Sequence, residues 1–485
     1  MRILVIDLGT SSVRATVLEP DGSVVGERAR ATLPDSPADG LVEFDALRYI
    51  QDALGCAHEV LAQHGPVTAV GVANQRATTI VWDRATGEPV APAQGWQDLR
   101  TVGDCLMLLA EGFALAPNQS ATKVANILNS VDPDRSRDLC FGTPDSWLVW
   151  HLTEGASHLS DLSNAGIWGL LRADGTGIDD SVADRLSIPT SMLPRIVDST
   201  GTVAEATALE GAPPICGIAG DQQASLIGQG CVHSGDVKAT FGTGGMLDVC
   251  LGAERPTFDR RGGAGCFPLV AWRDDSGITW GTEAVMLSAG TNVEWLVEDL
   301  GLVDSPAASE AKAAEVPSTD GVTYVPALLG LGTPKWDYGA RGALLGATRG
   351  TTAAHVVRAV LDGIAQRGAD LLDAARTDSG LALERLRVDG GMSTNALFTQ
   401  MLADAAGVPV EVSPLKEATT LGAGYLAGLA VGLWSGWDDI SAAWSPSRIV
   451  EPSVTDSDRA TARDRWAEAV ERAGHWHEDL SALDF

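Results

Sequence analysis

The sequence predicts an α/β protein built from two related domains. A Gly-Thr turn separates two short apolar segments near the start, at Gly9-Thr10, and the arrangement recurs in the second half at Gly242-Thr243. Two apolar segments joined by a tight turn are typical of a β-hairpin. The chain has 485 residues, the length of two or three ordinary domains. We therefore expect two domains, 1–228 and 229–485, that face one cleft.

Hydrophobic periodicity and turn residues predict the other elements. Continuous apolar runs predict strands, and apolar residues three or four apart predict helices. In chain order we expect strands at 2–7, 13–18, 67–73, 215–219, 237–241, 246–251 and 386–388, and helices at 45–64, 395–406 and 456–479. The first two strands and the apolar segment after Pro20-Asp21-Gly22 should form an antiparallel meander. Several strands end just before polar side chains, as α/β folds do where they present groups to a ligand.

Composition argues against several functional classes. The formal net charge of −30 disfavours nucleic-acid binding, which needs a basic surface, although an anionic nucleotide can bind through local donors and a divalent cation. Seven scattered cysteines without a Cys-x-x-Cys pair argue against a disulfide framework or a zinc site. Apolar runs are too short to cross a bilayer, and an early aspartate interrupts any signal-peptide core. We expect a cytoplasmic protein with no nucleic-acid or membrane partner.

Glycine-rich turns at three places suit phosphate or nucleotide binding. Asp7 to Ser12 combine a carboxylate, a glycine and three hydroxyls, a set whose backbone N–H groups can bind phosphate oxygens while Asp7 holds Mg²⁺ through water. Gly390-Gly391, between a strand and a helix, can pack a flat adenine ring against bare backbone. Each turn alone is equally consistent with an ordinary hairpin or junction. The Gly-Thr turns in both halves favour a shared phosphate site.

Ten stretches taken together, in this order, resemble the FGGY carbohydrate kinases, and within that family the glycerol kinases most closely. The resemblance spans roughly residues 2–435. The stretches are Asp7–Arg14, Asn74–Asp83, Trp96–Arg100, Ser120–Lys123, Gly142–Thr153, Ala219–Gln223, Phe241–Gly244, Trp336–Gly342, Val388–Asn395 and Thr419–Trp434.

The resemblance implies two ribonuclease-H-like domains of the actin and hexokinase type flanking a central catalytic cleft. The first domain would bind mainly substrate and the second mainly ATP. By position, Asp221 would be the general base, and Asp7 would lie beside Mg²⁺. A carboxylate can accept the proton of the attacking hydroxyl, so the chemistry suits Asp221. The residues implied to contact the nucleotide are Thr10, Ser11, Arg14, Gly242, Thr243, Gly290, Glu294, Gly391 and Asn395. Of these, Glu294 stands where glycerol kinases usually have glutamine.

The implied substrate site departs from the glycerol kinases at three positions. Arg76, Trp96, Asp221 and Gln222 match that subfamily. The positions that differ are Ala77 in place of a glutamate, Asn118 in place of a tyrosine and Met246 in place of a phenylalanine. Each change removes bulk or a polar group, so we expect a roomier pocket for a four- or five-carbon polyol or ketose.

Other functions compete with this interpretation. Within the class, the protein could be an authentic glycerol kinase whose pocket is rebuilt by other residues. Outside it, a non-catalytic nucleotide-dependent sensor and an ATP-driven conformational protein share the fold, but a sensor needs no base and neither needs the substrate residues Arg76 and Trp96. Relatives are often dimers or tetramers, so a homo-oligomer is among the expected forms.

Overall fold

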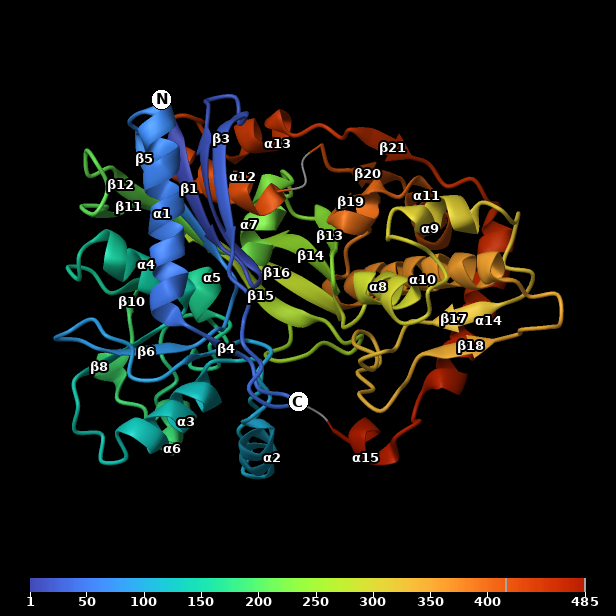
Figure 1. The fold of residues 1–485 in the computed structure, drawn as a ribbon, viewed down its shortest axis with the longest axis horizontal. Coiled ribbons are helices and arrows are strands. Elements are labelled where there is room, and N and C mark those ends of the chain that lie inside the picture. The colour runs from blue at the N-terminus through green and yellow to red at the C-terminus, as the bar shows by residue number, and fades with distance from the viewer. Residues whose placement is uncertain (415–416, 484–485) are drawn as a thin grey trace.

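Two mixed β-sheets, each covered by helices, make up the protein (Figure 1). The computed structural model describes residues 1–414 and 417–483. The six-stranded first sheet has the order β11-β12-β5-β1-β2-β3. Its strands are β1 (Ile3–Leu8), β2 (Ser12–Leu18), β3 (Val24–Ala31), β5 (Ala69–Asn74), β11 (Thr200–Glu205) and β12 (Pro214–Gly220). The predicted antiparallel meander is confirmed by the pairing of β1 with β2 and of β2 with β3.

The seven-stranded second sheet has the order β15-β16-β14-β13-β19-β20-β21. Its strands are β13 (Val237–Phe241), β14 (Gly245–Gly252), β15 (Phe267–Asp274), β16 (Gly277–Met286), β19 (Leu386–Asp389), β20 (Val410–Val412) and β21 (Arg448–Val450). Like β1, β13 pairs antiparallel with the next strand in the chain and parallel with a later one. The two sheets therefore repeat one topology, and both Gly-Thr turns join the first two strands of their sheet.

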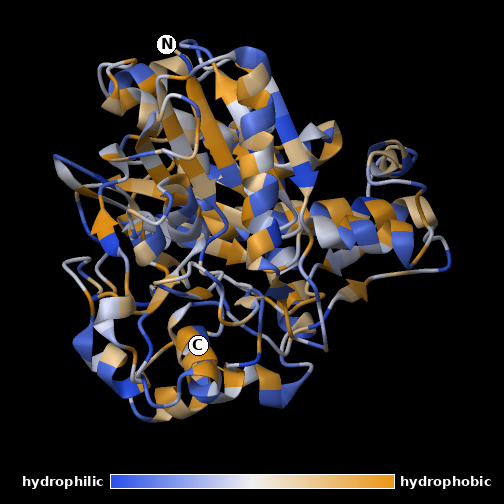
Figure 2. Ribbon diagram, turned by 60° about the vertical axis from the view of Figure 1, so that its left-hand side comes forward, coloured by the Kyte–Doolittle hydropathy of each residue, from blue (hydrophilic) through white to orange (hydrophobic). Residues whose placement is uncertain are grey.

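Helices cover both sheets. They include α1 (Ala46–His64), α4 (Pro144–Leu152), α7 (Asp221–Gly228), α8 (Gly290–Glu298), α10 (Ala353–Ser379), α11 (Ala396–Ala406), α12 (Ala418–Ala430) and α14 (Asp456–Ala473). Asp45 caps α1 by accepting from the backbone N–H groups of Leu47 and Arg48, and the apolar face of α1 packs on the first sheet. Figure 2 shows the strands nearest the N-terminus mainly in orange, as expected for strands between helical layers.

The remaining helices and strands lie outside the two main sheets. They are β4 (Glu43–Phe44), β6 (Ile80–Asp83), β7 (Ala93–Gln94), α2 (Val102–Ala110), α3 (Ala121–Val131), β8 (Leu139–Gly142), β9 (Leu159–Asp161), α5 (Leu162–Ala165), α6 (Asp180–Leu186), β10 (Arg195–Val197), α9 (Ala308–Ala313), β17 (Thr323–Val325), β18 (Ala343–Leu345), α13 (Trp437–Ala443) and α15 (Glu478–Ser481). The predicted helix 456–479 is too long, because Gly474 is extended and His475 has a left-handed φ of 54°.

Helices α7 and α12 pack backbone against backbone. A methyl group at Gly228 would lie 1.8 Å from the carbonyl oxygen of Ala418, and one at Gly422 would lie 1.8 Å from that of Ala224. Only glycine permits such a close approach. Helix α12, although late in the sequence, also packs on β12, β5 and β1 of the first sheet. Helix α7 is therefore packed tightly against α12 from its middle to its C-terminal end.

All seven cysteines are buried free thiols. Over the two described stretches of the chain, the search for an apolar helix long enough to cross a membrane finds none.

Candidate active site

Arg76, Asp221 and Gln222 meet at one edge of the first sheet. Strands β5 and β12 are parallel neighbours with Asn74 opposite Gly220, so the residues that follow each strand emerge together. Arg76 Nε lies 3.5 Å from Asp221 Oδ1. Gly220 leaves room for this approach, since a methyl group there would lie 2.8 Å from Arg76 Cδ. The structure thus brings together three of the predicted substrate residues.

The second sheet adds three charged residues that the sequence analysis missed. Glu283 on β16 accepts a 2.7 Å hydrogen bond from Arg76 Nη2 and joins the two halves of the chain. Lys238 on β13 forms a 2.7 Å ion pair with Asp248 on β14, and both side chains are fully buried. Asp248 is opposite Lys238 on one side and Glu283 on the other. A charged side chain inside an apolar strand is the signal that could have identified them.

Asp221 lies in surroundings suited to a proton acceptor. Burial raises the pKa of its carboxyl, and the nearby Arg76 guanidinium opposes that rise. The backbone N–H of Gln222 donates to Asp221 Oδ1 at 2.8 Å and fixes the carboxylate at the start of α7. A carboxylate with a raised pKa that is held in one orientation is a competent general base.

Asp7 lies beside this group at the end of β1. Burial raises its pKa to about 7, and the negative charge of Asp221 adds to the rise. Two adjacent carboxylates repel one another, and a divalent cation relieves that repulsion. Within residues 1–414 and 417–483, no cluster of three potential metal ligands occurs. Mg²⁺ commonly binds one or two carboxylates together with water and substrate phosphates, so this donor set fits Mg²⁺ held partly by a nucleotide.

Arg14, opposite Asp7 on β2, forms a 2.7 Å ion pair with Glu417. Thr10 accepts a 3.1 Å hydrogen bond from Trp96 Nε1 and donates at 3.2 Å to Gln75 Oε1. Ser11, next in the turn, is exposed. Trp96, predicted to lie in the substrate site, therefore contacts Thr10, predicted to contact the nucleotide.

The residues of the second half that are predicted to contact the nucleotide differ in exposure and in hydrogen bonding. Gly242 accepts a 2.8 Å hydrogen bond from the N–H of Gly290, which joins the turn to the start of α8. Gly391 faces open space, since an added methyl group would meet no atom within 4 Å. Thr243 and Glu294 are exposed.

Asn395 has an evident structural role. It caps α11 by accepting from the N–H of Phe398 at 2.9 Å. Its amide also donates to Ser309 Oγ at 3.3 Å.

The three positions that differ from glycerol kinases differ from one another in burial and in surroundings. Ala77 is buried and has a left-handed φ of 61°. Its carbonyl oxygen accepts a 3.0 Å hydrogen bond from Ser120 Oγ. Asn118 is exposed. Met246 is half-buried and points to the same face of β14 as Asp248, two residues on.

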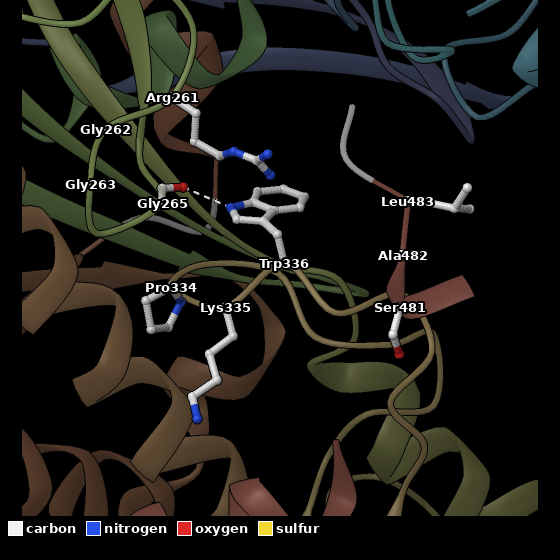
Figure 3. A pocket seen from close by; sticks show the side chains of 10 residues that line it. All are labelled: Arg261, Gly262, Gly263, Gly265, Pro334, Lys335, Trp336, Ser481, Ala482 and Leu483. Carbon is white, nitrogen blue, oxygen red and sulfur yellow. Dashed lines mark hydrogen bonds between the residues drawn. The ribbon is translucent and has the colours of Figure 1, made fainter. Parts of the chain in front are cut away.

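A separate pocket of about 320 Å³ lies away from these residues. It is lined by the loop around Gly262 and Gly265, by Pro334–Trp336 and by Ser481–Leu483 (Figure 3). Trp336 Nε1 donates to the carbonyl of Gly265 at 2.7 Å across it. None of the predicted site residues lines this pocket.

Comparisons with known proteins agree with the repeated fold. The FGGY carbohydrate kinase N-terminal domain matches residues 2–228, and the C-terminal domain of the same family matches residues 238–431. The chain is 41% identical to a glycerol kinase of Aromatoleum aromaticum, covering 98% of this chain and 99% of that protein. It is 40% identical to a glycerol kinase of Deinococcus radiodurans, covering 99% of both.

Solved structures of kinases superpose on nearly the whole chain. A Plasmodium falciparum glycerol kinase crystallised with ADP superposes with a TM-score of 0.91 at 27% identity, covering 100% of this chain and 99% of that one. A xylulose kinase from Rhodospirillum rubrum shares the fold, with a TM-score of 0.84 at 22% identity, covering 97% and 98%. The protein is thus a two-domain α/β kinase that uses ATP. It belongs to the FGGY family of carbohydrate kinases, and its substrate class is a small sugar or polyol.

Proposed function

We propose that this enzyme transfers the γ-phosphate of ATP to a hydroxyl of a small polyol or sugar, with Asp221 as general base. The observation that carries the proposal is the meeting of Asp221, Arg76 and Gln222 at one sheet edge, beside Asp7. We place the reaction in the cytoplasm, in line with the expectation from the sequence.

The mechanism follows from the chemistry of these groups. Arg76 donates to a substrate oxygen and orients the acceptor, while Asp221 removes the proton from the attacking hydroxyl. The backbone N–H of Thr10 and the glycine-rich turns supply donors for the phosphate oxygens. Asp7, together with the nucleotide, would hold Mg²⁺, and the ion would supply charge neutralisation for the phosphate oxygens.

The substrate we favour is a polyol or ketose of four or five carbons. Its support is the combination of Ala77, Asn118 and Met246, which removes a carboxylate and two aromatic rings that a glycerol pocket would use. Losing a buried hydrogen-bond acceptor typically costs about 1–3 kcal/mol of binding.

Glycerol is the second candidate. Its support is the 40–41% identity to glycerol kinases over nearly the whole chain.

The test is ADP release with Mg-ATP on glycerol, erythritol, threitol, pentitols, ketopentoses and hexoses. We expect turnover on a four- or five-carbon compound and its loss, by at least about a thousandfold, in Asp221→Asn. A micromolar KM for glycerol with no turnover of longer compounds would establish glycerol as the substrate. Retained turnover in Asp221→Asn would refute the role of Asp221.

A further inference from the structure

The ion pair between Lys238 and Asp248 is unusual in its burial. Both side chains are fully inaccessible, and Lys238 Nζ lies 2.7 Å from Asp248 Oδ2. Removing two charges from water costs several kcal/mol per ion, and well-packed apolar side chains often serve stability equally well. Stability alone therefore gives no reason for this pair, and its neighbours suggest another role.

Lys238 reaches from the second sheet to a substrate residue. Its ammonium group donates to Gln222 Oε1 at 2.8 Å and to Thr240 Oγ1 at 3.1 Å. An ammonium group can only donate, so the Gln222 atom that faces it must be the amide oxygen. The amide nitrogen of Gln222 must then point away from Lys238, and no protein group among residues 1–414 and 417–483 hydrogen-bonds to it.

Asp248 holds Lys238 in this position. It lies directly opposite Lys238 in the pairing of β13 with β14, and its Oδ2 lies 2.7 Å from the Lys238 ammonium group. Lys238 is thus the counter-ion of Asp248, and the pair anchors one end of Gln222.

We propose that Lys238, held by Asp248, is a positioning residue that fixes the Gln222 amide so that its NH₂ group donates to the substrate. This inference rests on the kinase function proposed above. A second donor, Arg76 Nη1, is also buried without a partner in the described part of the structure. The acceptor substrate therefore meets two fixed donors and one base, Asp221. Its recognised oxygens beside Gln222 and Arg76 accept hydrogen bonds, while the reacting hydroxyl gives up its proton.

The main test removes the pair without leaving a buried charge. In Lys238→Met with Asp248→Leu, we expect KM for the acceptor substrate to rise about tenfold, the effect of one lost hydrogen bond to a fixed donor. The KM for ATP should stay within about twofold. In the wild-type background, Gln222→Ala should raise the KM for the acceptor substrate about tenfold. In the Lys238→Met, Asp248→Leu background, the same change should raise that KM by less than a further factor of about two, because Lys238 acts through Gln222. Equal effects of Gln222→Ala in both backgrounds would overturn the proposal.

A second variant does not depend on replacing the core pair. Gln222→Glu keeps an oxygen for Lys238 but has no group to donate, so its acceptor KM should rise at least as much as in Gln222→Ala. A wild-type KM in Gln222→Glu would refute the assigned orientation.

Wild-type turnover is measured first, so that failure of the kinase function can be distinguished from failure of the positioning role. An inactive wild type refutes the kinase function. Unchanged KM values in variants of an active enzyme refute the positioning role. The substrate-induced shift in Tm repeats the comparison of the Gln222 variants without turnover: the shift should shrink in Gln222→Glu as in Gln222→Ala, and a wild-type shift in Gln222→Glu overturns the orientation.

Discussion

Replacing Glu283 with glutamine tests how firmly Arg76 is held between the two halves of the chain. The side chains of Arg76 and Glu283 are only 12% and 10% exposed, and their 2.7 Å contact is therefore weakly screened by solvent. At 2.7 Å and an effective dielectric constant near 20, the attraction is roughly 6 kcal/mol before desolvation is counted. Glutamine keeps a neutral hydrogen bond and is cheaper to bury, and Arg76 retains Asp221 at 3.5 Å.

The net loss should therefore be about 1–2 kcal/mol in the free energy of unfolding, the difference between a charged and a neutral hydrogen bond. Urea denaturation followed by circular dichroism measures it. The matched control is Glu111→Gln, which alters an exposed pair with Arg185 whose side chains are 46% and 41% exposed. That control should change stability by less than about 0.5 kcal/mol.

The variant should also raise KM for the acceptor substrate several-fold, because Arg76 loses one of its two carboxylate partners. The KM for ATP should not change. If Glu283→Gln matched the Glu111→Gln control in stability and kept a wild-type KM, the ion pair would have neither of the roles argued here.

Three further outcomes follow from the structure. Gly390→Ala should destabilise the fold by about 2–4 kcal/mol in urea denaturation, because Gly390 has φ +86° and a methyl group there would lie 2.5 Å from the Phe241 carbonyl oxygen. Gly391→Ala should change stability by less than about 0.5 kcal/mol and raise KM for ATP; equal destabilisation of both variants would contradict this. His151→Phe should be more stable than wild type by about 1 kcal/mol at pH 5 and equal at pH 7.5, because burial lowers the pKa of His151 to about 4. The unfolded state then takes up a proton between pH 6.5 and 4, so this residue lowers stability as pH falls through that window; a pH-independent difference would count against the explanation. Trp466→Ala should cost about 3–5 kcal/mol, since Trp466 is 3% exposed and donates to Asp370 at 3.0 Å; a cost below about 1 kcal/mol would show that α14 is not docked through it.

The sequence was informative about the proposed site residues that follow strand ends. Asp221 and Arg76 follow apolar strands directly, and parallel pairing then brings them to one edge whatever the intervening loops do. Lys238, Asp248 and Glu283 lie inside strands. There, the alternation of side chains along the strand indicates only on which face of the sheet a residue lies. Whether that face meets water or the other half of the chain depends on how the two sheets are placed, and a pattern along one strand carries no such information.

Asn395 shows a different limit. A helix cap and a nucleotide contact both call for a short polar side chain before a helix, so the sequence suits both roles equally. The structure supplies the cap hydrogen bond from Phe398, and ATP-dependent kinetics of an Asn395→Asp variant would separate the roles.

The packing of α12 has a consequence for how the protein is made. One face of the first sheet is covered by a helix that begins at residue 418, long after the last strand of that sheet ends at Gly220. The ribosome synthesises the chain from the N-terminus, so this face of the sheet stays uncovered until some two hundred further residues have been made. The first half cannot finish folding as it emerges, and a fragment that ends at residue 228 would expose an apolar sheet. The first sheet therefore depends on a helix from the second half of the chain to cover this face.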